Sequence, residues 1–336
     1  MLVDAPLITS GYDPIPELAR SLEAQGFDGI YSLEGPHDAL LPLAIAAQYT
    51  ERVQLTTSVV IAFARNPMTL AQGANDLHLL SHGRFNLGLG TQIKPHIEKR
   101  FSMEWSKPAA RMREFVQAIR AIWASWNDGE RLDFRGDFYT HTLMTPFFNP
   151  GKNPYGTPNI VLGGVGPLMT EVAGEVADGF MMHPFSTEKF MRETTLPALE
   201  RGLAKSGRSR DALEVAYPAM IIVAENDQEL EQARNMLKPR LGFYGSTPAY
   251  KVVLDAHGWG DIQPELNRMT KTGDYGGMVG MITDEIVDTF ATIGTTDEIA
   301  PKLKARYGDM VARVSLDSPV PLAEERTKAI LTALHE

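Results

Sequence analysis

Short apolar runs alternate with helical patterns along almost the whole chain. Several runs are rich in β-branched side chains, which is typical of buried parallel strands. Strands are predicted at Leu2–Ile8, Gly29–Leu33, Val53–Ile61, Arg84–Leu89, Asn159–Leu162, Gly179–His183, Glu214–Ala224 and Val311–Leu316. Helical patterns lie between them at Pro14–Gln25, Leu40–Thr50, Pro67–Leu80, Pro108–Trp126, Pro167–Val176, Thr187–Lys205 and Asp297–Tyr307.

Eight strands separated by helices predict a parallel sheet with right-handed crossovers. Eight is the number that closes an α/β (β/α)8 TIM barrel, so we expect residues 1–336 to form a single barrel domain. An open doubly wound sheet is the alternative. The segment between the seventh and eighth strands, Met236–Ile293, is too long for a simple connection and contains helical patterns. We therefore expect a helical insertion at residues 236–293.

Composition narrows the possible functions. Of the 336 residues, 43% are hydrophobic and 22% are charged, which is ordinary for a globular protein. The absence of cysteine excludes disulfides, thiolate metal sites and a catalytic thiol. The net charge of −10 disfavours nonspecific binding to nucleic acid. No apolar run approaches the ~18–20 residues of a membrane span and no signal peptide is visible, so we expect a soluble cytoplasmic protein.

In a barrel, chemistry is expected in the loops at the carboxyl ends of the strands. The loop after the second strand, Glu34-Gly35-Pro36-His37-Asp38, places an imidazole beside two carboxylates. Such an imidazole is suited to donate a proton, with a pKa that its neighbours tune. The alternative is a loop histidine that only forms local hydrogen bonds. After the third strand, Arg65 either meets an anion or reaches solvent.

The fourth strand carries glycines within an apolar run, in Arg84–Thr91. Gly88 and Gly90 either let a ligand approach the backbone or relieve crowding inside the barrel. Thr91 and Gln92 would then lie at the barrel mouth.

A second glycine-rich stretch, Gly163-Gly164-Val165-Gly166, follows the fifth strand and leads into a helix that begins at Pro167. Free backbone N–H groups at a helix N-terminus attract phosphate, whereas a plain connecting loop is the alternative. The stretch is not a dinucleotide fingerprint, because Met169 stands where the third glycine of G-x-G-x-x-G would be. No H-E-x-x-H, G-x-x-x-x-G-K-[ST] or G-x-S-x-G motif occurs, and no metal site is predicted.

Several of these segments together resemble the bacterial luciferase-like superfamily. The segment Ser81–Gly90 resembles the superfamily's S-x-G-R-F-x-L-G-x-G strand. Further matches, in the same order, are Thr57-Ser58-Val59, Asn66-Pro67, Gly163–Pro167 and Val172–Gly179. Phe101–Trp105 and Phe243–Pro248 are similar to one subgroup, the oxidoreductases that depend on the deazaflavin coenzyme F420.

The resemblance implies a barrel that holds a flavin-shaped cofactor at its C-terminal mouth. In the F420 subgroup it implies a non-prolyl cis peptide at Ser58-Val59, which backs the deazaflavin ring. His37 is then the candidate catalytic residue, as a proton donor or a substrate-orienting group. The other matching cofactor-binding positions are Asp38, Thr91, Gln92, His96, Val165, Gly166, Leu168 and Met169.

The activity that the resemblance implies is hydride transfer between F420 and a small organic substrate. An FMN-dependent monooxygenase that uses molecular oxygen is the first alternative, and a noncatalytic flavin-binding barrel is the second. Ile93 stands where sugar-phosphate dehydrogenases of the superfamily carry a glutamate, which argues against sugar-phosphate oxidation. A homodimer is expected. The aromatic residues expected either to line an apolar substrate pocket or to belong to the core are Phe63, Trp105, Phe147 and Phe148.

Overall fold

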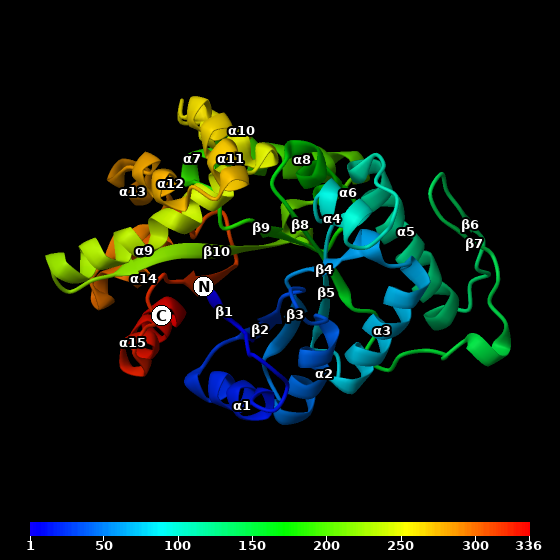
Figure 1. Cartoon of the computed structure of the whole chain (residues 1–336). Coiled ribbons are helices and arrows are strands. Elements are labelled where there is room, and N and C mark those ends of the chain that lie inside the picture. Colours follow the sequence, from blue (N-terminus) through cyan, green and yellow to red (C-terminus); the bar gives the residue numbers. More distant parts are fainter.

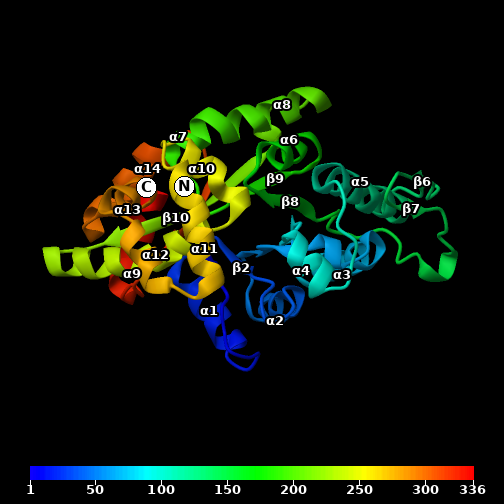
Figure 2. The same cartoon turned by 45° about the horizontal axis from the view of Figure 1, so that its top comes forward.

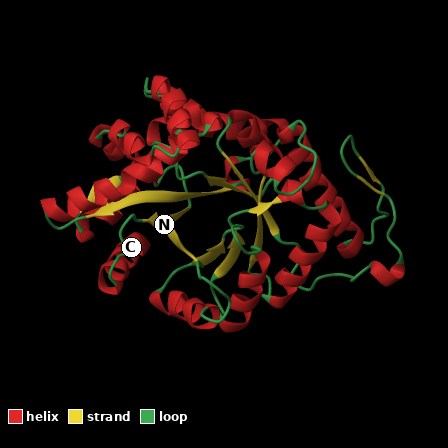
Figure 3. Cartoon of the chain, viewed as in Figure 1, coloured by secondary structure: helices red, strands yellow, loops and turns green.

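The strands form a closed ring that is surrounded by helices (Figures 1 and 3) in the computed structural model, which describes residues 1–336. Each ring strand pairs in parallel with the next, and the last pairs with the first. The predicted TIM barrel is therefore confirmed, and the open sheet is excluded. The ring strands are β1 (Leu2–Pro6), β2 (Gly29–Ser32), β3 (Gln54–Thr57), β5 (Phe85–Gly90), β8 (Asn159–Gly164), β9 (Gly179–Met182), β10 (Glu214–Val223) and β12 (Arg313–Asp317).

The helices outside the ring bury their apolar faces against the strands in one large core. The predicted helix Thr187–Lys205 is continuous but contains a π-helical turn at Met191–Thr195 between α7 and α8. No helix in the chain combines the length and the apolar composition that crossing a membrane requires. The outer helices are α1 (Ile15–Gln25), α2 (Leu40–Tyr49), α3 (Pro67–Leu80), α5 (Pro108–Asn127), α6 (Pro167–Val176), α7 (Glu188–Phe190), α8 (Leu196–Ser206), α14 (Thr296–Tyr307) and α15 (Glu324–His335).

A group of helices between β10 and β12 confirms the predicted insertion between the seventh and eighth strands. Its apolar cluster includes Phe185 and Phe190, which follow β9, so the insertion packs beside the carboxyl end of the barrel (Figure 2). The division into one barrel domain with an insertion at 236–293 stays a prediction. The inserted elements are α9 (Asp227–Gly245), α10 (Lys251–Asp255), α11 (Gln263–Thr272), α12 (Tyr275–Met281), α13 (Asp284–Phe290) and β11 (Thr292–Gly294), which pairs with β10.

The predicted third strand is interrupted at the position of the family match. β3 ends at Thr57, and β4 (Val60–Ile61) then pairs with β5. The peptide bond Ser58–Val59 between them is cis, which confirms the geometry that the resemblance implies. The Thr57 hydroxyl donates to the Gly88 carbonyl oxygen at 2.9 Å and accepts from the Gly88 N–H at 2.8 Å. Only glycine fits at position 88, because a Cβ there would collide with the Thr57 carbonyl oxygen.

A buried ion pair links the first and last strands of the ring. The Arg313 guanidinium donates to Asp4 through Nε at 2.9 Å and Nη2 at 2.6 Å, and its side chain is only 6% exposed. Glu214 of β10 lies 3.8 Å away. A charge that is buried to this degree depends on its partner for compensation.

We expect Asp4→Asn to lower the free energy of unfolding by about 3 kcal/mol, because it leaves the Arg313 guanidinium undercompensated. Chemical denaturation measures this loss. The control Glu17→Gln breaks the exposed pair with Arg20 and should cost less than about 1 kcal/mol. Equal losses in the two variants would contradict the role of the buried pair.

Candidate functional site

The carboxyl ends of the ring strands open at one end of the barrel, and the centre of this mouth is closed by small and apolar groups. A Cβ on Gly163 would lie 3.2 Å from Val59 Cγ1, and one on Gly90 would collide with Val59 Cγ2. The Ser58 hydroxyl donates to Met181 Sδ at 2.8 Å, across the ring from β9. We call Ser58, Val59, Gly90, Gly163 and Met181 the mouth floor.

The loop after β2 carries the predicted catalytic residue in an exposed position. The His37 ring lies against Tyr12, with 5.5 Å between the ring centroids. Asp38 Oδ1 accepts a hydrogen bond from the Leu40 N–H at 2.7 Å, at the start of α2. The Asp38 carboxylate also pairs with Arg65. Within this structure, Asp38 therefore orders the loop that presents His37.

The Arg65 side chain is mostly buried, and its guanidinium is paired with carboxylates of the chain itself. Its Nη1 contacts Glu34 Oε2 at 2.5 Å and its Nη2 contacts Asp38 Oδ2 at 2.7 Å. The same Glu34 oxygen accepts from the Ile61 N–H at 2.7 Å. Two carboxylates thus neutralise the guanidinium, and the resulting network ties the loop after β2 to the end of β4. Sequence reasoning named these side chains but did not foresee that they compensate one another.

The residues after β5 make few contacts beyond their own loop. The Thr91 hydroxyl donates to the Gln92 carbonyl oxygen at 2.9 Å, and the Gln92 side-chain oxygen accepts from the Ile93 N–H at 3.0 Å. Gln92 has a φ of 59°, in the left-handed region that non-glycine residues seldom adopt. His96 is exposed on the short helix α4 (Lys94–Lys99). The His96 ring and the Gln92 side-chain nitrogen make no hydrogen bond within the chain, so these two groups remain available to a ligand.

The loop after β8 divides into open and packed positions. Gly166 is the N-cap of α6, and a Cβ added there would meet no atom within 4 Å. Leu168 is 71% exposed. Val165 instead packs against the apolar cluster of the insertion, and Met169 packs against the main core. The open positions leave the N-terminus of α6 accessible to an anionic group.

Three residues at the mouth were missed by sequence reasoning. His183 directly follows β9, and its ring centroid lies 4.9 Å from that of Tyr244 and 4.5 Å from that of Tyr250. Its Nδ1 accepts from the Phe185 N–H at 3.0 Å. Burial lowers the pKa of His183 to about 4. The strand end was visible in the sequence, but no spacing rule links it to two tyrosines of the insertion.

A second missed group joins β12 to the insertion. Arg240 Nη1 of α9 contacts Asp317 Oδ1 at 2.7 Å. The Tyr31 hydroxyl on β2 lies 3.5 Å from Ser315 Oγ. Burial raises the pKa of Tyr31 to about 12, and the nearby Asp317 charge adds to this effect. Tyr31 therefore remains a neutral hydroxyl at the mouth at ordinary pH.

The aromatic residues proposed for a substrate pocket do not line the mouth together. Phe63 belongs to the core, and Trp105 packs edge-on against it with 5.7 Å between centroids. Phe147 and Phe148 are 88% and 64% exposed. Their turn lies beside the last turn of α5, where Asn149 contacts the Ser125 carbonyl oxygen at 3.4 Å. A helix that follows a barrel strand returns toward the opposite end, so this turn is far from the mouth.

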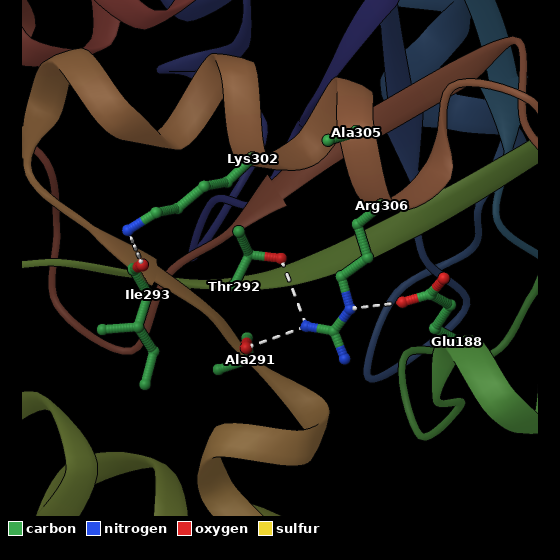
Figure 4. A pocket seen from close by; sticks show the side chains of 7 residues that line it. All are labelled: Glu188, Ala291, Thr292, Ile293, Lys302, Ala305 and Arg306. Carbon is green, nitrogen blue, oxygen red and sulfur yellow. Dashed lines mark hydrogen bonds and ion pairs between the residues drawn. The ribbon is translucent and has the colours of Figure 1, made fainter.

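One hollow on the surface lies outside the ring of strands. It has a volume of about 370 Å³. Figure 4 shows that its charged side chains already have partners in the chain: Arg306 contacts Ala291, Thr292 and Glu188, and Lys302 donates to Ile293. The lining belongs to α7, β11 and α14, so this hollow is separate from the mouth floor. Its lining residues are Glu188, Ala291, Thr292, Ile293, Lys302, Ala305 and Arg306.

Comparison with known proteins decides the family. Residues 3–313 match the model of the luciferase-like monooxygenases. The chain belongs to this family. An uncharacterized family relative from Mycobacterium tuberculosis is 50% identical over 298 residues, which cover 89% of this chain and 88% of the relative.

Two further relatives have names that state a function. A 5,10-methylenetetrahydromethanopterin reductase of Archaeoglobus fulgidus is 30% identical, with 83% of this chain and 80% of the relative covered. A putative coenzyme F420-dependent oxidoreductase of Mycobacterium tuberculosis is 29% identical, with 85% of both chains covered.

Solved structures show that this luciferase-like fold is shared by reductases and monooxygenases. The F420-dependent tetrahydromethanopterin reductase of Methanopyrus kandleri matches with a TM-score of 0.79 and 19% identity, over 99% of this chain and 97% of that one. A type II Baeyer-Villiger monooxygenase of Pseudomonas putida in complex with FMN matches with a TM-score of 0.67 and 15% identity, over 99% and 96%.

The low pKa of His183 makes stability depend on pH. The pKa is about 4 in the folded protein against an ordinary value of 6.5, so the unfolded chain binds more protons between these values. Stability therefore falls as the pH falls through this window. We expect the thermal midpoint of His183→Gln to drop less than that of the wild type between pH ~6.5 and ~4.5. In the control His96→Gln, the thermal midpoint should drop as much as in the wild type. An equal drop in His183→Gln would contradict the burial of a neutral imidazole.

Proposed function

We propose that this protein is a coenzyme F420-dependent oxidoreductase that transfers a hydride between the deazaflavin and a small organic substrate. The observation that carries the proposal is the mouth floor, where Val59 packs against Gly90 and Gly163, two positions that lack side chains. Two relatives, at 30% and 29% identity, are named as a methylenetetrahydromethanopterin reductase and a putative F420-dependent oxidoreductase. Their names support this cofactor and this reaction class for the chain.

The residues at the mouth fit a flat ring with a phosphate-bearing tail. Ser58 and Val59 would carry the ring. Asp38, Thr91, Gln92 and His96 would contact the coenzyme from the loops after β2 and β5. The open cradle at Gly166 would accept the tail, because the helix dipole and free N–H groups of α6 favour a negative charge there. The other proposed contacts in that loop are Val165, Leu168 and Met169.

The bound coenzyme would supply the carbon that accepts or donates the hydride. His37 would move the accompanying proton as a general acid or base. The Arg65 network holds the loop of His37 in place, since Glu34 and Asp38 are both engaged with it. Tyr244 and Tyr250 of the insertion would exclude water from the reacting atoms.

An FMN-dependent monooxygenase is the second candidate. The observation that favours it is the fold shared with an FMN complex. A 5-deazaflavin does not readily activate oxygen, so the identity of the bound cofactor separates the two activities. A noncatalytic flavin-binding barrel would bind a cofactor without turnover. The homodimer, the cytoplasmic location and the lack of nucleic-acid binding stay predictions.

We expect F420 to bind with at least about tenfold higher affinity than FMN in fluorescence titrations, a difference of about 1.4 kcal/mol. Gly166→Val should weaken F420 binding, because its side chain would enter the open cradle without disturbing the fold. The control Gly276→Val adds a side chain to equally open space on α12 and should bind like the wild type. Tighter FMN binding, or equal F420 binding by both variants, would count against the proposal.

We expect His37→Asn to lower kcat by about 100-fold or more with little change in F420 affinity, because general acid–base catalysis typically contributes about 10²–10⁴-fold. Turnover would be measured with a substrate found by screening alcohols, carbonyl compounds and pterins. His82→Asn is the matched control: His82 is exposed, and its φ of 54° suits asparagine. An unchanged kcat in His37→Asn would reject the proton-transfer role.

A further inference from the structure

His183 stands at the opening of the barrel mouth. Met181 of β9 points into the ring, because its sulfur contacts Ser58 on the far side. His183 is the first residue after β9, which ends at Met182, and its ring lies against those of Tyr244 and Tyr250 of the insertion. It therefore lies beyond the mouth floor, at the carboxyl end of the barrel.

The hydrogen bonds of His183 fix the position of its proton. Nδ1 accepts from the Phe185 N–H at 3.0 Å, so Nδ1 carries no hydrogen. In a neutral imidazole the hydrogen then lies on Nε2, which becomes a donor. Burial keeps the ring neutral at ordinary pH, because it lowers the pKa to about 4.

This Nε2–H group makes no hydrogen bond within the chain and is not among the fully enclosed polar atoms. The enclosed side-chain atoms that lack a hydrogen-bond partner belong to other residues: Trp126, His141, Glu175, Arg240 and Tyr307. The imidazole thus has one N–H group without a hydrogen-bond partner, beside the rings of Tyr244 and Tyr250. A fixed donor beside two aromatic rings is suited to hold one oxygen atom of an otherwise apolar molecule.

We propose that Nε2–H of His183 donates a hydrogen bond to the reacting oxygen of the substrate, and that the substrate is a carbonyl compound or the corresponding alcohol. This inference rests on the proposed F420-dependent activity. In the reducing direction, a hydride from the reduced deazaflavin forms the new C–H bond, and the C=O π pair moves to the oxygen. His183 would stabilise the negative charge there until His37 delivers the proton that completes the alcohol, and the coenzyme would be oxidised by two electrons.

The groups that contact the His183 ring carry no charge: they are a backbone N–H and aromatic rings. Arg240, one turn before Tyr244 on α9, contacts Asp317 through Nη1, and its Nε and Nη2 have no hydrogen-bond partner. His183 itself therefore offers a neutral donor, and not a cation, to an oxygen of the substrate.

The test uses cyclohexanone as the probe and the full-length protein with ¹⁵N-labelled histidine. In the wild type, NMR should show the Nε2–H tautomer of His183 and a shift of its Nε2 resonance as cyclohexanone is added, with and without F420. His183→Phe keeps a ring but removes the donor, and should weaken cyclohexanone binding by about tenfold. His183→Gln places an amide N–H near the same point and should restore most of the affinity. His141→Phe, on the hairpin strand β7 (Thr140–His141), is the control and should bind like the wild type.

Each outcome bears on the inference. A titrating or Nδ1-protonated His183, an Nε2 resonance that ignores cyclohexanone, or equal binding by His183→Phe and the wild type would overturn it. F420 affinity, measured separately by fluorescence, should stay within about twofold in all variants. Failure of the wild type to bind F420 would instead refute the proposed function, because the tautomer and the probe contact are read without the coenzyme.

Discussion

The packing of Val59 between two glycines is the constraint on which the mouth of the barrel depends. β3 leaves the sheet at Thr57, and its hydroxyl takes over the hydrogen bonds of Gly88. Val59 can then pack against the fourth and fifth strands because Gly90 has no side chain, and because a side chain at Gly163 would crowd it. The glycines of the fourth and fifth strands thus belong to one packing arrangement around Val59. This arrangement forms the floor of the mouth, above which the surrounding loops are open.

Much of the fold could be predicted because hydrophobic periodicity reports burial directly. The helix Pro67–Leu80 was predicted with its bounds, since Asn66 caps it by accepting from the Met68 N–H at 2.9 Å. The helix α9 was not predicted as an element. α9 begins at Asp227 and contains Pro239, a residue that ordinarily interrupts a helical pattern. The break in the strand after Thr57 could not be predicted from strand propensity, because the neighbouring β-branched residues favour an unbroken strand.

The candidate site could be predicted only in part. Strand ends and glycines pointed to the loops after β2, β5 and β8, which the ring brings to one mouth. The partners across the mouth could not be found in this way, since Arg240 and Asp317 are 77 residues apart and meet only after the barrel closes. His183 was visible at a strand end, but its role depends on a backbone N–H and on the aromatic residues of the insertion.

The most direct measurement of the central claim is a crystal structure of the protein with F420 bound. The account predicts a deazaflavin ring lying on Ser58 and Val59, with its tail toward Gly166 and its open face toward His183. A coenzyme bound elsewhere, for example in the hollow beside Arg306, or a mouth that remains closed by side chains in the presence of saturating F420, would contradict it.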